Sequence, residues 1–160
     1  MKRTELPQHL QELLQRICFA TVATVGADGQ PWGTPMVVKF DDDLNMYWVT
    51  NKFSRHIHNL EHEPRMFATV YDSSLPNGDP AIDALYLEMM GEVLTTPEAI
   101  TEAREHSGIQ FSENLPDHES FLGDCPRRFA KASLVKAWHN VEIDSDDHRI
   151  DAREELPILV

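Results

Sequence analysis

A group of hydroxyl-bearing and basic residues between Leu44 and Leu60 is the part of the sequence best suited to chemistry. This stretch contains no Asp or Glu, although the 160-residue chain has a net charge of -13. Its polar members are Thr50, Lys52, Ser54, Arg55, His56 and His58. Unpaired backbone N–H groups at the start of a helix attract anions, and hydroxyl and cationic side chains complete the shell around a phosphate. The sequence therefore predicts a phosphate site here.

A strand and a helix are expected to hold this group in place. Residues 46–50 are apolar or β-branched and predict a strand that ends at Thr50. Ser54 is a favourable N-cap and Pro64 a helix stop, which predicts a helix of about two turns over residues 55–63. The hydroxyl and basic groups would then lie where the strand passes into the helix.

The remaining elements predict a small antiparallel barrel. Six strands are expected, over residues 18–25, 31–40, 46–50, 66–71, 85–94 and 129–143. Further helices are predicted over residues 6–17, with Thr4 as a cap, over residues 97–106 and near residues 116–122. Short turns such as Asp28-Gly29 join most strands, so the chain is interpreted as one mainly β domain over residues 1–160.

Alternation along two strands predicts which side chains face the core. One predicted core set in the second strand is Trp32, Thr34, Met36, Val38 and Phe40. In the last strand, one face is predicted to carry Ala130, Ala132, Leu134, Lys136 and Trp138. Pro35 cannot donate to a strand ladder, which places it at a sheet edge or a bulge. The acidic segment 144–160 ends in apolar residues, Ile158 to Val160, which are expected to dock on the body or on a partner subunit.

Composition limits the classes of function. Hydrophobic residues make up 41% and charged residues 26% of the chain, as in ordinary globular proteins. The negative charge argues against binding to nucleic acid or to anionic membranes. No apolar run reaches membrane-spanning length, the N-terminus has no apolar signal core, and Cys18 and Cys125 form no CxxC pair. We therefore expect a cytoplasmic protein with free thiols.

The histidines offer a metal-binding alternative. His58 and His62 fit the H-x-x-E-H pattern of an inverted zinc-peptidase motif and would share one helix face. Such a site needs a third ligand on a downstream helix, and the chain offers no convincing one. No metal site is predicted.

The order of these segments resembles the pyridoxamine 5'-phosphate oxidase-like family of FMN-binding split barrels. The segments that carry the resemblance are a helix before FATVAT, the Asp28-Gly29 turn, TPMVVK, a strand ending VTNKFSRH, and the helix end NLEHEP. The resemblance extends over about residues 6–138. It implies a six-stranded antiparallel split β-barrel of Greek-key type, and a homodimer with FMN at the subunit interface.

The resemblance also assigns cofactor-binding residues. Ten positions match those that contact FMN in the family, namely Thr34, Met36, Val37, Lys39, Val49, Thr50, Ser54, Arg55, His56 and Trp138. Residues 34–39 would flank the ring and ribityl chain, and residues 49–50 would contact the flavin and its phosphate. Residues 54–56 match a Ser-Arg-Lys phosphate clamp, and Trp138 matches an aromatic residue that the partner subunit lays near the flavin.

Two of these positions carry specific expectations. His56 replaces the lysine of the clamp, and because imidazole is only partly charged near neutral pH, a weaker and slightly pH-dependent clamp is expected. Lys39, placed near the pyrimidine end of the ring, would stabilise the negative charge of reduced flavin and raise its potential.

The resemblance favours an FMN-dependent oxidoreductase or flavin reductase of the stress-protein type, with hydride from a nicotinamide or a small organic donor. Synthesis of vitamin B6 is not expected, because His148-Arg149 lies in a carboxylate-rich segment that suits a phosphorylated substrate poorly. The alternatives are a non-catalytic FMN-binding or redox-sensing protein, and a split barrel that binds haem or a deazaflavin. For haem, an axial ligand could come from His56, His58 or His139.

Overall fold

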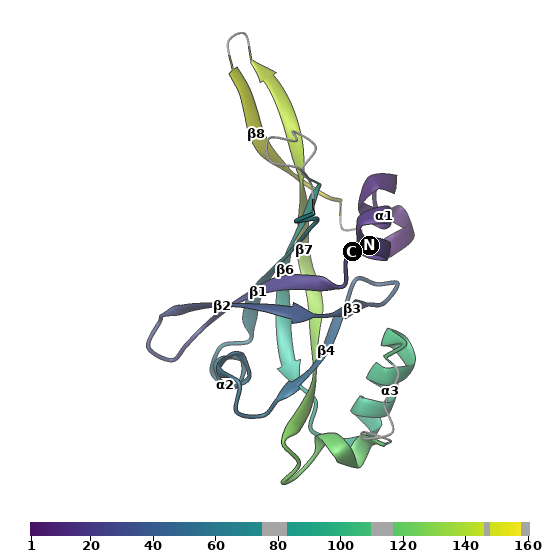
Figure 1. The fold of residues 1–160 in the computed structure, drawn as a ribbon, viewed down its shortest axis with the longest axis vertical. Coiled ribbons are helices and arrows are strands. Elements are labelled where there is room, and N and C mark those ends of the chain that lie inside the picture. The colour runs from purple at the N-terminus through teal and green to yellow at the C-terminus, as the bar shows by residue number, and fades with distance from the viewer. Residues whose placement is uncertain (75–82, 110–116, 146–147, 158–160) are drawn as a thin grey trace.

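A single curled antiparallel sheet forms most of the molecule in this computed structural model (Figure 1). The strands are β1 (Phe19–Val25), β2 (Pro31–Val37), β3 (Lys39–Phe40), β4 (Met46–Asn51), β5 (Arg65–Tyr71), β6 (Ala84–Val93), β7 (Arg127–Ser145) and β8 (His148–Glu155). The structure describes residues 1–74, 83–109, 117–145 and 148–157, and it describes no side chains for residues 142–151. The predicted mainly β split-barrel class is confirmed.

The two ends of the sheet are close in sequence. The strands follow the order β2-β1-β5-β6-β7-β4-β3, with β8 paired to β7, and every pairing is antiparallel. Only Val38 separates β2 from β3, and its backbone N–H donates to the carbonyl of Cys18 at 2.8 Å. The chain therefore turns from one end of the sheet to the other at Val38, which leaves an open seam between β2 and β4. Pro35 lies on the edge strand β2, as predicted.

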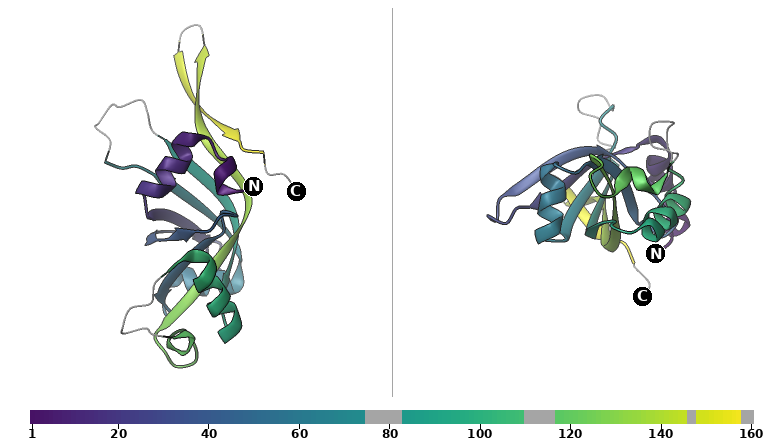
Figure 2. Two further views of the ribbon diagram at one scale, coloured as in Figure 1. Left: turned by 90° about the vertical axis from the view of Figure 1, so that its right-hand side faces the viewer. Right: turned by 90° about the horizontal axis from the view of Figure 1, so that it is seen from below.

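The helices lie on opposite sides of the molecule (Figures 1 and 2). They are α1 (Gln8–Arg16), α2 (Arg55–His62) and α3 (Pro97–Ser107), with 3-10 turns η1 (Arg3–Glu5) and η2 (His118–Phe121). Helices α1 and α3 share one side and α2 lies on the other. Arg16 of α1 donates to the Asp72 carboxylate at 2.6 Å, which ties this helix to the end of β5. Among the described residues, no helix combines the length and apolarity needed to cross a membrane.

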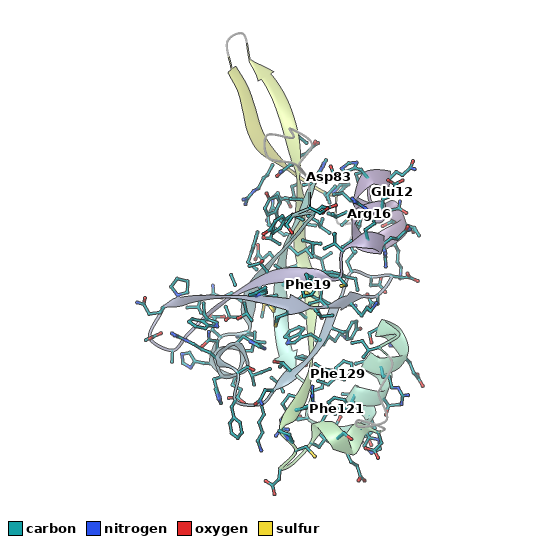
Figure 3. The ribbon with its side chains drawn as sticks, in the orientation of Figure 1. Glu12, Arg16, Phe19, Asp83, Phe121 and Phe129 are labelled. Atoms are coloured by element: carbon teal, nitrogen blue, oxygen red, sulfur yellow. The ribbon has the colours of Figure 1, made fainter. Side chains whose placement is uncertain are left out.

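The buried apolar side chains among the described residues form two clusters. The larger cluster joins the buried faces of the strands to α1 and α2. In β1, the buried residues Ala20 and Val22 alternate with exposed neighbours, so one face of this strand points into the cluster. The smaller cluster lies beside α3, where Phe121 and Phe129 pack edge to face with centroids 5.6 Å apart (Figure 3). The cysteines Cys18 and Cys125 are free, as predicted.

The described residues form eight strands, two more than predicted. The segment predicted as one strand over residues 31–40 breaks at Val38 into β2 and β3. The additional β8 comes from the acidic segment, and it forms with β7 a hairpin that projects beyond the rest of the molecule (Figure 1). Leu156, after β8, is buried, and its N–H donates to the carbonyl of Ala137 at 2.8 Å. The docking predicted for Ile158 to Val160 lies outside the described residues.

Three local predictions were wrong. Helix α1 is capped by Pro7 rather than Thr4, because Thr4 belongs to the separate turn η1. Trp32 is 41% exposed rather than in the core, because the first half of the edge strand β2 runs past the packed interior. In β7, the register shifts from Lys136 opposite Glu88 to Leu134 opposite Met89. The bulge residue Val135 reverses the alternation beyond it, so Ala137 is buried instead of its neighbours.

Candidate functional site

A cleft of about 630 Å³ lies at the open seam of the sheet. Its lining residues come from β2, the end of β4 and the start of α2: Trp32, Gly33, Thr34, Pro35, Met36, Val37, Val49, Thr50, Ser54, Arg55 and His56. Eight of the ten predicted cofactor-binding residues therefore meet in one place, the exceptions being Lys39 and Trp138. The size is within the range of small-molecule sites.

One end of the cleft is formed by the first turn of α2. Ser54 is the N-cap, as predicted, but its hydroxyl makes no capping bond and instead lies 3.2 Å from the hydroxyl of Thr50. The first intrahelical N–H donor is Ile57, which bonds the Ser54 carbonyl at 3.0 Å. The amides of the first residues of a helix have no intrahelical acceptor. This end thus offers hydroxyls and backbone N–H groups to an anion.

Arg55 lies at the same end and is held by two neighbours that the sequence did not identify. Its guanidinium stands 4.6 Å from the centroid of the Trp32 ring, and Nη2 is 3.9 Å from the carboxylate of Asp28. Asp28 belongs to the turn between β1 and β2, outside the carboxylate-free stretch. Folding therefore brings one acid near the predicted clamp, and the ring of Trp32 fixes the cation at the cleft.

Two polar atoms in the cleft walls lack partners. Thr34 Oγ1 and His56 Nε2 are buried, and neither has a hydrogen-bond partner in the described part of the chain. Burial lowers the pKa of His56, which favours the neutral imidazole near pH 7. Buried polar groups are normally hydrogen-bonded, so these atoms are suited to a polar ligand.

A buried hydrogen bond anchors α2 to the sheet beside the cleft. Asn59 donates through Nδ2 to Oγ1 of Thr24 at 2.9 Å, and both residues are buried. Asn59 lies one helical turn after Arg55, so this bond fixes the height of the first turn of α2 against β1.

Replacing Asn59 with alanine is expected to lower the free energy of unfolding by about 1–3 kcal/mol, because Thr24 loses its buried donor. For a protein of this size, each kcal/mol corresponds to roughly 2–4 °C in Tm. Thermal unfolding followed by circular dichroism measures the change. The matched control is His58→Ala, at an exposed position of the same helix. Equal Tm values for the two variants would contradict an anchoring role.

The other polar residues of the predicted site lie elsewhere. Lys39 borders a separate pocket of about 280 Å³, with Cys18 and Arg3. Lys52 donates to the carbonyl of Asp124 at 3.1 Å and does not line the cleft. Trp138 stacks on Phe67 with centroids 6.1 Å apart, on the outward-facing side of the sheet. Lys39 and Trp138 are therefore not brought to the cleft within one chain.

The two histidines of the zinc-peptidase alternative are not joined by further metal ligands in the described part of the chain. His58 Nδ1 is 3.4 Å from the carboxylate of Glu61 at the surface. Within the residues that the structure describes, no group of three or more His, Cys, Asp or Glu side chains is arranged to hold a metal ion.

The curled sheet and its seam cleft define the class: a split-barrel protein with a site of small-molecule size between its sheet ends. Residues 6–124 match the sequence model of the family described as pyridoxamine 5'-phosphate oxidase. The chain belongs to this family. A 45-residue segment is also 47% identical to the pyridoxine/pyridoxamine 5'-phosphate oxidase of Aeromonas hydrophila, which is 28% of this chain and 21% of that protein. The match thus spans about a fifth of the curated relative.

Solved structures confirm the fold. A heme binding protein from Mycobacterium smegmatis superposes with a TM-score of 0.63 at 14% identity, over 92% of this chain and 58% of that one. An F420 reductase gives 0.56 at 17% identity, over 82% and 98%. HutZ, a heme storage protein from Vibrio cholerae, gives 0.57 at 14% identity, over 81% and 90%. At these identities the likeness establishes the fold alone.

Proposed function

We propose that the seam cleft binds FMN. The observation that carries this proposal is the convergence of eight predicted FMN-contacting residues from three separate elements on one cleft. The phosphate would lie at the start of α2, against the hydroxyls of Thr50 and Ser54 and the guanidinium of Arg55. The ring system would lie along β2, whose exposed edge backbone and apolar residues Met36 and Val37 can contact a flat, mostly apolar group.

The proposed reaction class is oxidoreduction, as an FMN-dependent oxidoreductase or flavin reductase. Bound FMN supplies hydride transfer, and the residues of the chain bind it and orient it. Membership of the family supports a flavin, and the unpartnered atoms Thr34 Oγ1 and His56 Nε2 support a polar ligand in the cleft. The substrate and the electron donor are not part of the proposal.

A homodimer is proposed as the form that completes the site. The outward-facing side of the sheet carries an apolar surface, here called the outer face, made of Phe19, Val37, Phe67, Tyr71, Tyr86 and Trp138. Phe19 and Val37 face each other across β1 and β2, and each is 56% exposed. Val37 also lines the cleft. A second copy on this face would therefore adjoin the cleft and bring a Trp138 towards it.

The absorption spectrum of the purified protein, before and after addition of FMN and dialysis, tests the cofactor. Retention of the two flavin bands, one FMN per chain, is the expected result. A haem spectrum, or retention of a deazaflavin in place of FMN, would overturn FMN as the ligand and favour the corresponding alternative. Oxidation of reduced nicotinamide by the loaded protein then separates an enzyme from a flavin-binding protein without turnover.

A further inference from the structure

His56 lines the cleft, is buried, and has a ring nitrogen without a hydrogen-bond partner among the described residues. His56 is 4% exposed, and it lines the cleft beside Arg55. Its Nε2 finds no partner among the described residues. A buried nitrogen without a partner is costly, so a ligand atom that hydrogen-bonds to it would relieve this cost.

The charge of the cleft is low for a phosphate monoester. Arg55 is the one Arg or Lys among the described residues that line it, and the Asp28 carboxylate lies 3.9 Å from the Arg55 guanidinium. A phosphate monoester carries a charge of about -1.5 to -2 near pH 7. With His56 neutral, one shared cation would face nearly two negative charges. A proton on His56 would supply the missing positive charge next to the phosphate.

We propose that His56 is the second cationic arm of the phosphate site and becomes charged only when the ligand binds, so that the cleft takes up a proton together with the phosphate. This inference rests on the proposed binding of FMN. The free site keeps the imidazole neutral because burial disfavours its charged form, and the arriving phosphate reverses this preference. His56 thereby makes cofactor affinity depend on pH, whereas a lysine at this position would remain charged in both states.

The described walls of the cleft around His56 carry few charged side chains. Burial lowers the pKa of His56. The described elements around the cleft carry charged or titratable side chains at Arg55 and His58 on α2, at Lys52 in the turn before it, at Asp28 in the turn between β1 and β2, and at Arg127 and Arg128 of β7, which pair with the end of β4. Residues 32–37 of β2 and 49–50 of β4, which form the other walls, contain no titratable side chain.

Titration calorimetry with FMN at about pH 7, in buffers of different ionisation enthalpy, counts the protons taken up per FMN. We expect roughly half a proton or more for the wild type, and affinity roughly two- to fivefold weaker at pH 8.5 than at pH 7. The sign follows from linkage: a complex that holds the extra proton loses affinity as pH rises. His56→Lys and His56→Gln should both lose most of the uptake, and only His56→Lys should keep tight binding.

The matched control is His58→Gln, which removes an exposed histidine of the same helix and should keep the wild-type proton uptake. Equal uptake in the wild type and in His56→Gln, or no uptake in the wild type, would overturn this inference while leaving FMN binding intact. If His56→Lys does not fold, the comparison of proton uptake between the wild type and His56→Gln is sufficient to test the inference. Absence of any binding heat and of any change in flavin absorption would overturn the proposed function, and this inference with it.

Discussion

Replacement of Arg55 by alanine is expected to weaken FMN binding by about 1.5–3 kcal/mol, a roughly 10- to 150-fold higher Kd. A charge-assisted hydrogen bond to phosphate is stronger than a neutral one, and Arg55 is the permanent cation among the cleft-lining residues that the structure describes. Its side chain is half-exposed and its contacts are with Trp32 and Asp28 at the surface, so the fold should persist. Quenching of flavin fluorescence gives Kd, and thermal unfolding checks the fold.

The control for this experiment is Lys52→Ala. Lys52 is a cation of the same segment, but its ammonium group donates to the carbonyl of Asp124 away from the cleft. We expect its Kd to stay near that of the wild type. Full flavin occupancy of Arg55→Ala at micromolar FMN would show that Arg55 is not a phosphate ligand. An equal loss in both variants would show that general charge, rather than a specific contact, holds the phosphate.

The parts of the site that could be predicted from the sequence are those set by local rules. Ser54 before the helix and Pro64 after it determine the ends of α2 to within a residue. Gly29 has the positive φ of 76° that the predicted turn requires. Pro97 at the first position of α3 has no N–H to leave unpaired. Each signal depends on residues a few positions apart, so a pattern in the chain is sufficient to find it.

The parts that could not be predicted depend on how distant segments meet. Asp28 and Arg55 are far apart in the sequence, and only the docking of α2 beside the first hairpin brings them to 3.9 Å. The alternation along β2 predicts that Trp32 faces the core. However, the first half of this edge strand is not covered by a second layer, so Trp32 is exposed. Val135 is a bulge because the pairing of β7 with β6 shifts register at this point. The sequence around Val135 contains no local signal of this shift.

Lys39 and Trp138 do not line the cleft of their own chain, but a second copy of the chain could bring them to the cleft of its partner. Trp138 lies in a row of paired residues that crosses the outer face from Thr21 through Thr69 and Tyr86. Residues paired in this way point to the same side of a sheet. If a second copy covers the outer face, its own Trp138 and the Val37 edge of the cleft become neighbours. If the partner's Trp138 completes the cleft, loss of the dimer should weaken FMN binding.

Replacement of Phe19 by glutamate is expected to dissociate the dimer and to weaken FMN binding with it. Phe19 is 56% exposed on the outer face, and a symmetric dimer would contain two such substitutions. Burying an unpaired carboxylate costs several kcal/mol, so the dimer Kd should rise by about 100-fold or more. Light scattering after size exclusion should then give 18.3 kDa, where the wild type gives twice that mass.

Phe53→Glu is the matched control, since Phe53 is 71% exposed but lies in the turn before α2, away from the outer face. It should keep the mass of the dimer. A Phe19→Glu protein that stays dimeric would place the interface elsewhere and remove the reason to assign Trp138 to a partner's cleft. A Phe19→Glu monomer that binds FMN as tightly as the wild type would show that one chain holds the cofactor alone. Loss of both the dimer and FMN binding would show that contact through the outer face is needed for FMN binding in the cleft.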